Sequence, residues 1–448
     1  MRTYLGSLGC KLNQSEMDAL AERLAQAGHE IVASPAQADL CILNTCAVTG
    51  VAAQKSRQAL RRLHRESPHA SLVATGCYAE LSPDELQDLP GVQLVAGTQA
   101  KERLADLLLK AAAWLPHSKG SGTQAEERLA DLLAGQGLTP VPWSDRPAPR
   151  THTRALVKIQ DGCDNACTYC IIRLARGPQR SRPPDEVVAE VRARREAGYQ
   201  EVVLTGVHIG AYGRDRHARA PGVDLWGLVA RILAETDLPR LRLSSIEPWD
   251  LPETALRLWD DPRLCRHLHL PLQSGCDATL RRMARRYTSA EFAGLVAAAR
   301  SAIPDLAVTT DLIVGFPGET HEEFLESLAF VRSLGLARAH VFPFSSRPGT
   351  PAATMPGQVP APVKAGRAGA MRRIAEASER AFQQQFIGRT LQVLWESACE
   401  SAAGPVWSGL TGNYLRVSVA GAAHLHNSLT PVRLEALVDD CLQGRLET

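Results

Sequence analysis

The sequence lacks an excess of charge of either sign, a long apolar run and an N-terminal signal segment. Its 50 lysines and arginines stand against 48 aspartates and glutamates, so total charge neither requires nor excludes a nucleic-acid partner. No uncharged apolar run approaches the roughly 18 to 20 residues of a membrane span. The opening residues, MRTYLGSLGCK, contain no apolar signal core. We therefore expect a cytoplasmic protein without membrane association.

Length and cysteine content limit the possible organisation further. A chain of 448 residues exceeds what one hydrophobic core usually serves, so two or three domains are expected. In a reducing compartment the 11 cysteines are expected to be thiols. Such cysteines are metal ligands, catalytic groups or small buried side chains more often than disulfide halves.

Hydrophobic patterning predicts three domains of different architecture. Residues 1–137 begin with short β-rich runs that alternate with helical stretches, which indicates a doubly wound parallel α/β domain. Residues 151–386 contain further strands with intervening helices, which predicts a partial TIM-like (β/α)6 barrel. Residues 387–448 change to short strands with Gly and Asn turns, typical of a small antiparallel β-barrel. The six strands expected in the central domain are 154–160, 201–207, 241–247, 266–272, 306–315 and 337–344.

A duplicated segment lies between the first two domains. The run GTQAKERLADLL at 97–108 recurs as GTQAEERLADLL at 122–133, with eleven of twelve residues identical. A unit repeated once is too short an array for a solenoid, so we interpret the insert, about 97–133, as a surface helix without a catalytic role. The Pro-rich residues 138–150 are predicted to be a linker.

Three cysteines lie close together in the stretch DGCDNACTYC. Cys163, Cys167 and Cys170 are spaced C-x3-C-x2-C and follow the first expected barrel strand, which places them on the catalytic face of a barrel. Structural zinc normally has four protein ligands. No further Cys or His occurs in residues 171–200, so no fourth ligand lies nearby in the sequence. An iron–sulfur cluster held by three thiolates keeps one iron open to a substrate. The spacing therefore favours such a cluster over a zinc ribbon.

Three further cysteines each end a predicted strand of the first domain. They are Cys10, Cys46 and Cys77. Loops that leave the carboxyl ends of parallel strands form the ligand crevice of an α/β sheet. Gly9 and Gly76 directly precede two of these cysteines and favour a tight turn that approaches a ligand. We interpret the set as a second metal site, with ordinary burial of each cysteine as the alternative.

A series of short motifs is spread over nearly the whole chain. They are GCKLNQSE, NTCAVT, ATGCYAE, IQDGCDNACTYCII, ARGPQRSRP, TGVHIGAYG, SSIEP, HLPLQSG and TDLIVGFPGET. In these motifs the sequence resembles the radical S-adenosylmethionine (SAM) methylthiotransferase family. GCKLNQSE and GVHIGAYG resemble most the branch that acts on N6-threonylcarbamoyladenosine in tRNA. Two positions depart from the family pattern: Arg173 stands where a proline usually follows CII, and Cys276 where a serine usually follows PLQSG.

The resemblance implies two 4Fe-4S clusters and SAM as cofactors. One cluster would be held by Cys163, Cys167 and Cys170, and its open iron would bind the amino and carboxylate groups of SAM. Reductive cleavage of SAM would give a 5′-deoxyadenosyl radical that abstracts a hydrogen atom from carbon 2 of the adenine. The second cluster would carry the sulfur to be inserted, and its ligands would be Cys10, Cys46 and Cys77. A low-potential electron donor such as flavodoxin or ferredoxin is also implied.

The resemblance also suggests further cofactor-binding residues at the ends of barrel strands. They are Thr205, Gly206, Glu247, Gln273, Gly315 and Pro317. In this superfamily the end of the second strand usually offers backbone groups to the SAM amino group, and the GFPGE turn lies on the adenine side. For each residue an ordinary structural role is the alternative. His208 and His269 are expected to be hydrogen-bonded core or rim residues rather than metal ligands.

Binding of nucleic acid would depend on local charge. Basic residues adjoin the expected active-face loops in three clusters: Lys55, Arg57, Arg61, Arg62 and Arg65; Arg173, Arg176, Arg180 and Arg182; and Arg281, Arg282, Arg285 and Arg286. These clusters predict a basic rim that binds phosphates. The C-terminal barrel resembles a tRNA-binding domain, yet residues 388–448 contain six acidic residues, four arginines and no lysine. Either it binds through shape and stacking on Trp395, Trp407 or Tyr414, or much of the RNA contact lies elsewhere.

Three functions follow from these patterns. The first is methylthiolation of carbon 2 of N6-threonylcarbamoyladenosine at tRNA position 37, with the anticodon stem-loop as partner. The second keeps the chemistry and changes the substrate to isopentenyladenosine in tRNA or to a ribosomal protein. The third is a non-catalytic zinc-binding RNA module in which the cysteines are structural.

Overall fold

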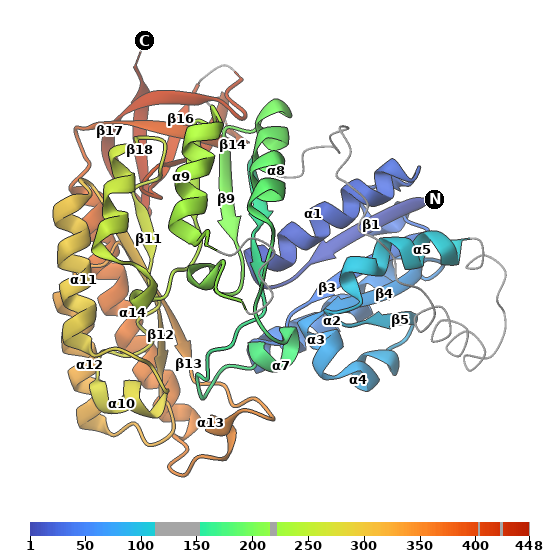
Figure 1. Cartoon of the computed structure of the whole chain (residues 1–448), viewed down its shortest axis with the longest axis horizontal. Helices are drawn as coiled ribbons and strands as arrows, with labels where there is room; N and C mark the ends of the chain where they lie inside the picture. Colours follow the sequence, from blue (N-terminus) through green and yellow to red (C-terminus); the bar gives the residue numbers. More distant parts are fainter. Residues whose placement is uncertain (113–152, 216–221, 402–403, 422–423, 448) are drawn as a thin grey trace. The chain divides into compact units, whose positions relative to one another are not determined.

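A computed structural model describes residues 1–112, 153–215, 222–401, 404–421 and 424–447 (Figure 1). By their contacts, residues 1–9, 16–46 and 53–112 form one compact unit; residues 10–15, 47–52 and the described residues from 153 onward form a second. The second copy of the duplicated run, at 122–133, and the predicted linker at 138–150 lie outside the described residues. The domain boundaries read from the sequence therefore stay a prediction.

The N-terminal unit is built on a five-stranded parallel sheet. Its strand order, β2-β1-β3-β4-β5, confirms the predicted doubly wound architecture. Strand β3 is buried along its whole length, as expected for a parallel strand covered on both faces. The strands are β1 (Arg2–Ser7), β2 (Glu30–Ile31), β3 (Leu40–Thr45), β4 (Ser71–Gly76) and β5 (Val92–Ala96). The helices along this stretch are α1 (Lys11–Gln26), α2 (Gly50–Glu66), α3 (Cys77–Leu81), α4 (Pro83–Gln87) and α5 (Leu104–Ala112).

A buried ion pair attaches the first copy of the duplicated run to this sheet. Lys101 Nζ lies 2.6 Å from Glu16 Oε2 and 3.1 Å from Asn44 Oδ1. The side chains of Lys101 and Glu16 are only 5% and 8% exposed, so little solvent screens the pair. Lys101 is also the one position at which the two copies differ, because the second copy has Glu126 there.

The centre of the second unit is a series of six parallel strands. β6 pairs with β9 and β9 with β10, while β11 pairs with β12 and β12 with β13. Parallel bridges Leu241–Leu264 and Ser245–His269 connect the two halves. Among the described residues no ladder joins β13 to β6, so the partial (β/α)6 barrel predicted from the sequence is confirmed. The strands are β6 (Arg154–Lys158), β9 (Glu201–Thr205), β10 (Arg240–Leu243), β11 (His267–His269), β12 (Ala307–Val314) and β13 (Arg338–Pro343).

Helices and one short antiparallel strand pair accompany the central strands. This pair joins β7 (Gln160–Asp161), which follows β6, to β8 (Arg180–Ser181). Two of the helices, α11 and α12, begin with a complete capping box, at Thr288 with Glu291 and at Thr320 with Glu323. The helices are α7 (Ile172–Arg176), α8 (Pro184–Glu196), α9 (Leu225–Glu235), α10 (Asp277–Arg282), α11 (Ser289–Ala302), α12 (His321–Ser333), α13 (Pro351–Thr354) and α14 (Ala361–Gln384).

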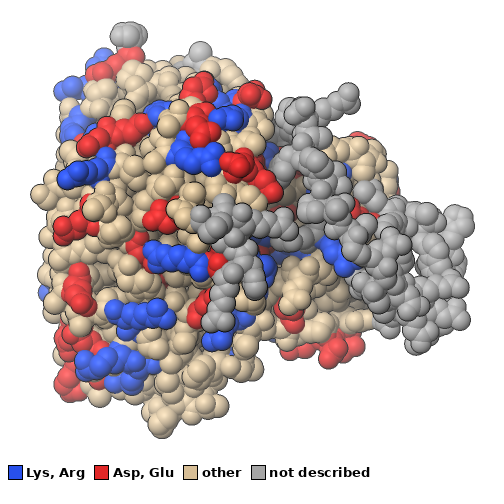
Figure 2. Space-filling view, in the orientation of Figure 1, with Lys and Arg blue, Asp and Glu red and all other residues tan. Residues whose placement is uncertain are grey.

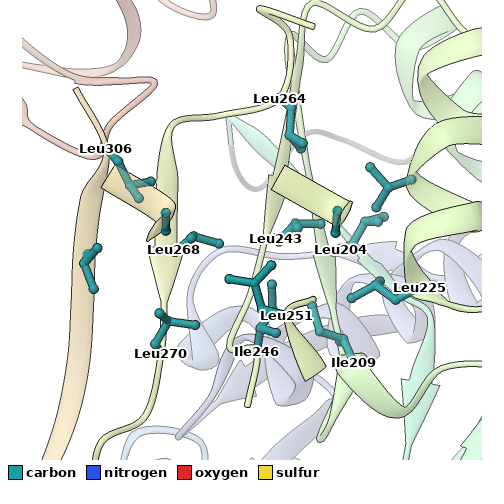
Figure 3. Packing of buried hydrophobic residues seen from close by; sticks show 14 of the residues in the cluster. Leu204, Ile209, Leu225, Leu243, Ile246, Leu251, Leu264, Leu268, Leu270 and Leu306 are labelled. Atoms are coloured by element: carbon teal, nitrogen blue, oxygen red, sulfur yellow. The ribbon is translucent and has the colours of Figure 1, made fainter. Parts of the chain in front are cut away.

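An apolar core fixes the ends of the central strands. Leu204 near the end of β9 and Leu243 at the end of β10 belong to the same cluster as Ile209, Leu225 and Leu251 (Figure 3). None of these five side chains is more than 4% exposed. Burial of each such side chain contributes about 1.5 to 3 kcal/mol. The loops that follow β9 and β10 therefore start from fixed positions.

The C-terminal strands close into a small barrel in the order β14-β15-β16-β18-β17 (orange to red in Figure 1). Its pairs are antiparallel except β16 with β18, which is parallel. The strands are β14 (Thr390–Ser401), β15 (Gly404–Thr411), β16 (Arg416–Ala420), β17 (Leu429–Val438) and β18 (Cys441–Leu446). Trp395 and Trp407 are buried in its core, and Tyr414 stacks on His267 at 4.7 Å. Base stacking on these three rings is therefore not available, which favours RNA contacts elsewhere.

Charges of both signs are mixed over the described surface. On the face in Figure 2, lysine and arginine side chains lie among aspartates and glutamates rather than in one large basic field. Many of them form ion pairs, such as Arg231 with Asp185 and Glu235. Among the described residues, no helix combines the length and the apolar character needed to cross a membrane.

We predict that Lys101→Glu destabilises the N-terminal unit. It places a second carboxylate beside the buried Glu16 and removes its partner, a change that typically costs about 3 to 5 kcal/mol. Chemical denaturation measures the free energy of unfolding. The control is Arg62→Glu in the exposed Arg62–Glu66 pair, where we expect a loss of less than about 1 kcal/mol. Equal losses for both variants would contradict the role of the buried pair.

Candidate active site

The loop with the three clustered cysteines connects β7 to α7 and is tightly fixed at its base. Gly162 has φ 68°, and a Cβ there would lie 1.9 Å from the carbonyl oxygen of Pro178. The Cys163 amide donates a hydrogen bond to the Gly177 carbonyl oxygen at 3.1 Å. The base of the loop is also closed by the β7–β8 pairing. Only glycine fits at position 162, so this residue sets the direction in which Cys163 leaves the barrel.

Cys163 is surrounded by polar groups. The Asn165 amide donates to its Sγ at 3.4 Å, and His208 Nδ1 lies 3.9 Å from the same atom. On its other side, His208 Nε2 lies 2.5 Å from Asp250 Oδ2, and Arg214 donates to Asp250 Oδ1 at 2.6 Å. Burial lowers the pKa of His208, but the hydrogen bonds with Asp250 and Cys163 outweigh it and raise the pKa to about 9.

Cys167 lies next to a buried arginine. Arg285 Nη1 is 3.6 Å from Cys167 Sγ, and the same guanidinium forms a two-point ion pair with Glu247. It also donates to the Pro271 carbonyl oxygen at 2.9 Å. Burial raises the pKa of the Cys167 thiol, and Glu247 adds to the rise, whereas Arg285 opposes it.

Cys170, like the other two cysteines of the loop, is partly buried. Burial raises its pKa to about 12. Its amide donates to the Cys167 carbonyl oxygen at 3.1 Å, which turns the chain between the two cysteines. The neighbouring ring of Tyr169 packs edge-on against Phe316 at 6.5 Å, so the cysteine loop contacts the GFPGE turn.

The donor set of this loop fits an iron–sulfur cluster. Three thiols lie within eight residues, and two of them face N–H donors, which stabilise the negative charge of cluster sulfurs. Within the described ranges, no group of three or more His, Cys, Asp and Glu side chains is arranged around a single metal position. A cluster does not need such an arrangement, because each thiolate binds a different iron.

The structure places the other expected barrel residues in the loops that follow the central strands. Thr205 ends β9, where its carbonyl oxygen accepts from Ile159, and the following amides of Val207 and His208 donate to Gln160 Oε1. Gln273 has φ 66°, which is unusual for a residue other than glycine, and pairs with Leu312 of β12 through an isolated bridge. The structure brings together the cysteine loop, the ends of β9 and β10, and Glu247. Gly206 directly follows Thr205 and begins the loop after β9.

The GFPGE turn is braced by α14. Gly315 has φ 70° and its amide donates to Glu319 Oε2 at 2.7 Å, while Arg367 of α14 donates to Glu319 Oε2 at 2.6 Å. A Cβ at Gly315 would lie 2.3 Å from the Lys364 side chain. Pro317 is buried in the turn. These contacts explain the turn's shape without a ligand, so the role of Gly315 and Pro317 in SAM binding stays a prediction.

The second cysteine set follows three neighbouring strands of the N-terminal sheet. Cys46 and Cys77 come directly after Thr45 and Gly76, which are partners in the β3–β4 ladder. Cys10 follows β1, whose last residue, Ser7, pairs with Asn44 of β3. All three strands run in parallel, so Cys46 and Cys77 lie at one edge of the sheet, and β1 ends at that same edge three residues before Cys10. Ligands of such sheets bind at this edge where the strand order reverses, here between β1 and β3.

Gly76 is required by the geometry at this edge. It has φ 102°, and a Cβ there would lie 2.2 Å from Asn44 Oδ1 and 2.5 Å from the Thr45 carbonyl oxygen. Gly9, which precedes Cys10, also has a positive φ, 101°. The tight turns predicted before these two cysteines are therefore present.

The basic rim predicted from the sequence is smaller than expected. Arg176 is only 2% exposed and donates to Asp161 at 2.9 Å, and Arg285 is 7% exposed beside Cys167. Their assignment to the rim was wrong, because both guanidinium groups turn inward to carboxylates. In the predicted clusters the exposed basic residues are Lys55, Arg61, Arg62, Arg65, Arg173, Arg180, Arg281 and Arg286. Arg61, Arg62 and Arg65 lie in the second half of α2, which runs away from Cys46.

Comparisons with known proteins agree with this site. The radical SAM superfamily model matches residues 157–331, and that of the uncharacterized protein family UPF0004 matches residues 2–97. Threonylcarbamoyladenosine tRNA methylthiotransferase MtaB of Bacillus subtilis is 36% identical, over 96% of this chain and 92% of the relative. The chain belongs to the radical SAM methylthiotransferase family. Two 4Fe-4S clusters and SAM are therefore its cofactors, as the resemblance implied.

Other relatives of this methylthiotransferase differ in the substrate that their names give. The MtaB enzyme of Thermotoga maritima is 36% identical over 87% of this chain and 85% of its own. The tRNA-2-methylthio-N(6)-dimethylallyladenosine synthase of Maricaulis maris is 33% identical over 99% and 97%. Among solved structures, the radical SAM methyltransferase TsrM of Kitasatospora setae shares the fold, with a TM-score of 0.55, 17% identity, and coverage of 79% of this chain and 77% of that one.

The residues that sequence analysis missed lie directly beside those it found. Arg285 was read as one member of the run RRMARR, and Asp250 lies three residues after Glu247 in SSIEPWD. Nothing in one sequence shows that position 285 faces a cysteine 118 residues earlier. His208 was expected to be a hydrogen-bonded core residue, and its bond with Asp250 agrees, but its position beside Cys163 was not foreseen.

We predict that Gly76→Ala prevents assembly of the N-terminal cluster while the barrel cluster persists. The added Cβ cannot be accommodated beside Thr45, so Cys77 must move. Iron analysis after anaerobic reconstitution should fall from about eight to about four per chain. Gly28→Ala is the control, since Gly28 also has positive φ, 88°, but nothing lies within 4 Å of its Cβ position. Full iron content in Gly76→Ala would contradict this geometry.

Proposed function

We propose that this protein adds a methylthio group to carbon 2 of N6-threonylcarbamoyladenosine at position 37 of tRNA, next to the anticodon. The observation that carries the proposal is the pair of three-cysteine sets, each at the carboxyl ends of parallel strands. Family membership supports the chemistry, and the names of the MtaB relatives support the substrate.

In this proposal the chain's residues have separate roles. Cys163, Cys167 and Cys170 hold the cluster that binds SAM, and Cys10, Cys46 and Cys77 hold the other. When bound, these cofactors supply the radical and the sulfur for carbon–sulfur bond formation. Thr205 and Gly206 are suited to orient SAM through backbone groups, and Gln273, which has a positive φ and pairs with Leu312 of β12, is proposed as a further SAM contact.

The choice between the two tRNA substrates rests on the relatives' names. The two MtaB enzymes share 36% of residues with this chain, and the dimethylallyladenosine synthases of Maricaulis maris and Sorangium cellulosum share 33% and 35%. The difference is small, so isopentenyl (dimethylallyl) adenosine is the second candidate. Family membership argues against the zinc-binding module, and the relatives' names argue against a ribosomal protein.

Further partners follow from the reaction. The cluster that binds SAM needs one electron for each cleavage, so we infer a low-potential donor such as flavodoxin or ferredoxin. The tRNA anticodon stem-loop would contact exposed basic residues beside the barrel cysteines, such as Arg173 and Arg180. Since its tRNA substrate is cytoplasmic, we also infer a cytoplasmic location.

Nucleoside mass spectrometry tests the substrate. We predict that expression in a host without its own methylthiotransferases converts threonylcarbamoyladenosine in tRNA to the 2-methylthio form. Cys163→Ala should abolish the product, because the SAM cluster loses a ligand, whereas Cys265→Ala, which changes a buried barrel thiol outside the loop, should retain it. Methylthiolation of dimethylallyladenosine alone would favour the second substrate, and product formation by Cys163→Ala would contradict the mechanism.

A further inference from the structure

Arg285 is a buried arginine whose guanidinium is fixed by an ion pair, hydrogen bonds and aromatic rings. Its side chain is 1% exposed, and Glu247 pairs with it through both carboxylate oxygens. The Pro271 carbonyl oxygen accepts from Nη2 at 2.9 Å, and Tyr287 Oη accepts from Nε at 3.3 Å. The guanidinium also lies over the rings of Trp249, at 4.8 Å, and Tyr287, at 5.2 Å. It is therefore a fixed positive charge in a site with little solvent.

Among the hydrogen-bond partners of this guanidinium, Cys167 supplies the one sulfur atom. Nη1 points to Cys167 Sγ at 3.6 Å, within the range of an N–H···S hydrogen bond. Glu247 and Trp249 come from the loop after β10, and Tyr287 follows Arg285 by two residues. Two segments far apart in the sequence thus hold the Arg285 guanidinium beside the sulfur of Cys167.

We propose that Arg285, positioned by Glu247, sets the reduction potential of the cluster held by Cys163, Cys167 and Cys170. Glu247 is then a positioning residue for Arg285 rather than a direct SAM ligand. This inference depends on the proposed assignment of that cluster to these cysteines.

The sign of the effect follows from the charge change. When the cluster takes up one electron from the low-potential donor, the donor is oxidised and the cluster gains one negative charge. Hydrogen bonds to the sulfurs and nearby positive charge favour the reduced state and raise the potential. Because arginine stays charged at any working pH, the effect does not require a proton to move. Loss of Arg285 should therefore make the cluster harder to reduce.

The test is an EPR-monitored redox titration without SAM. The full chain carries Cys10→Ala, Cys46→Ala and Cys77→Ala in all samples, so that only the barrel cluster contributes. We expect Arg285→Met with Glu247→Gln, which removes the pair together and leaves no unpaired carboxylate, to lower the reduced-to-oxidised ratio at a given potential at least tenfold, or about 59 mV. Arg285→Lys, which keeps the charge but not the two-point pairing, should give a smaller shift.

A matched control keeps the interpretation specific. Arg338 and Glu379 form an ion pair of the same residue types, though more exposed, at the amino end of β13, and Arg338→Met with Glu379→Gln should leave the potential unchanged. An unchanged potential in the Arg285 variants would overturn this inference alone. Unchanged potential with weaker SAM binding would also overturn it and would make Arg285 a SAM ligand. A parent protein that forms no cluster would overturn the proposed function and this inference together.

Discussion

The parallel pairing of strands is the constraint on which both cysteine sets depend. In a parallel sheet every strand ends on the same edge, so residues far apart in sequence meet there without any long-range signal in the sequence itself. The β3–β4 register aligns Cys46 with Cys77, and the β6–β9 register places the cysteine loop beside His208. Glycines with positive φ, at 76 and 162, let the chain turn at these edges. The same rule of strand direction thus accounts for the position of both cysteine sets after parallel strands.

Much of this arrangement can be read from the sequence. The positions of the six cysteines after strands follow from short β-rich runs that end shortly before these cysteines, and the structure has strands at these places. The sequence does not show whether a polar side chain points into the protein or toward solvent. Arg176 and Arg285 look like surface arginines in sequence, yet both are buried because carboxylates distant in sequence pair with them. Such pairing depends on tertiary contacts that local composition does not encode.

The departures from the family pattern are accommodated locally. Cys276 is the N-cap of α10 and is buried, and its thiol donates to Glu326 at 3.2 Å, so it occupies the place of a small polar residue. Arg173 is exposed in α7, where the helix needs no proline. In the part of the chain that the structure describes, neither side chain hydrogen-bonds to a cysteine of the loop. The electrostatic groups around that loop, His208 with Asp250 and Arg285 with Glu247, are instead supplied by the barrel core.

Central to this account is a barrel cluster with one iron left open for SAM. Electron–nuclear double resonance on the reduced protein, with 15N in the amino group and 17O in the carboxylate of SAM, measures this contact directly. The account predicts hyperfine coupling from both labels to the cluster, and loss of both couplings when Cys167 is changed to alanine. A cluster that forms without coupling to either label, or a protein that holds zinc in its place, would contradict it.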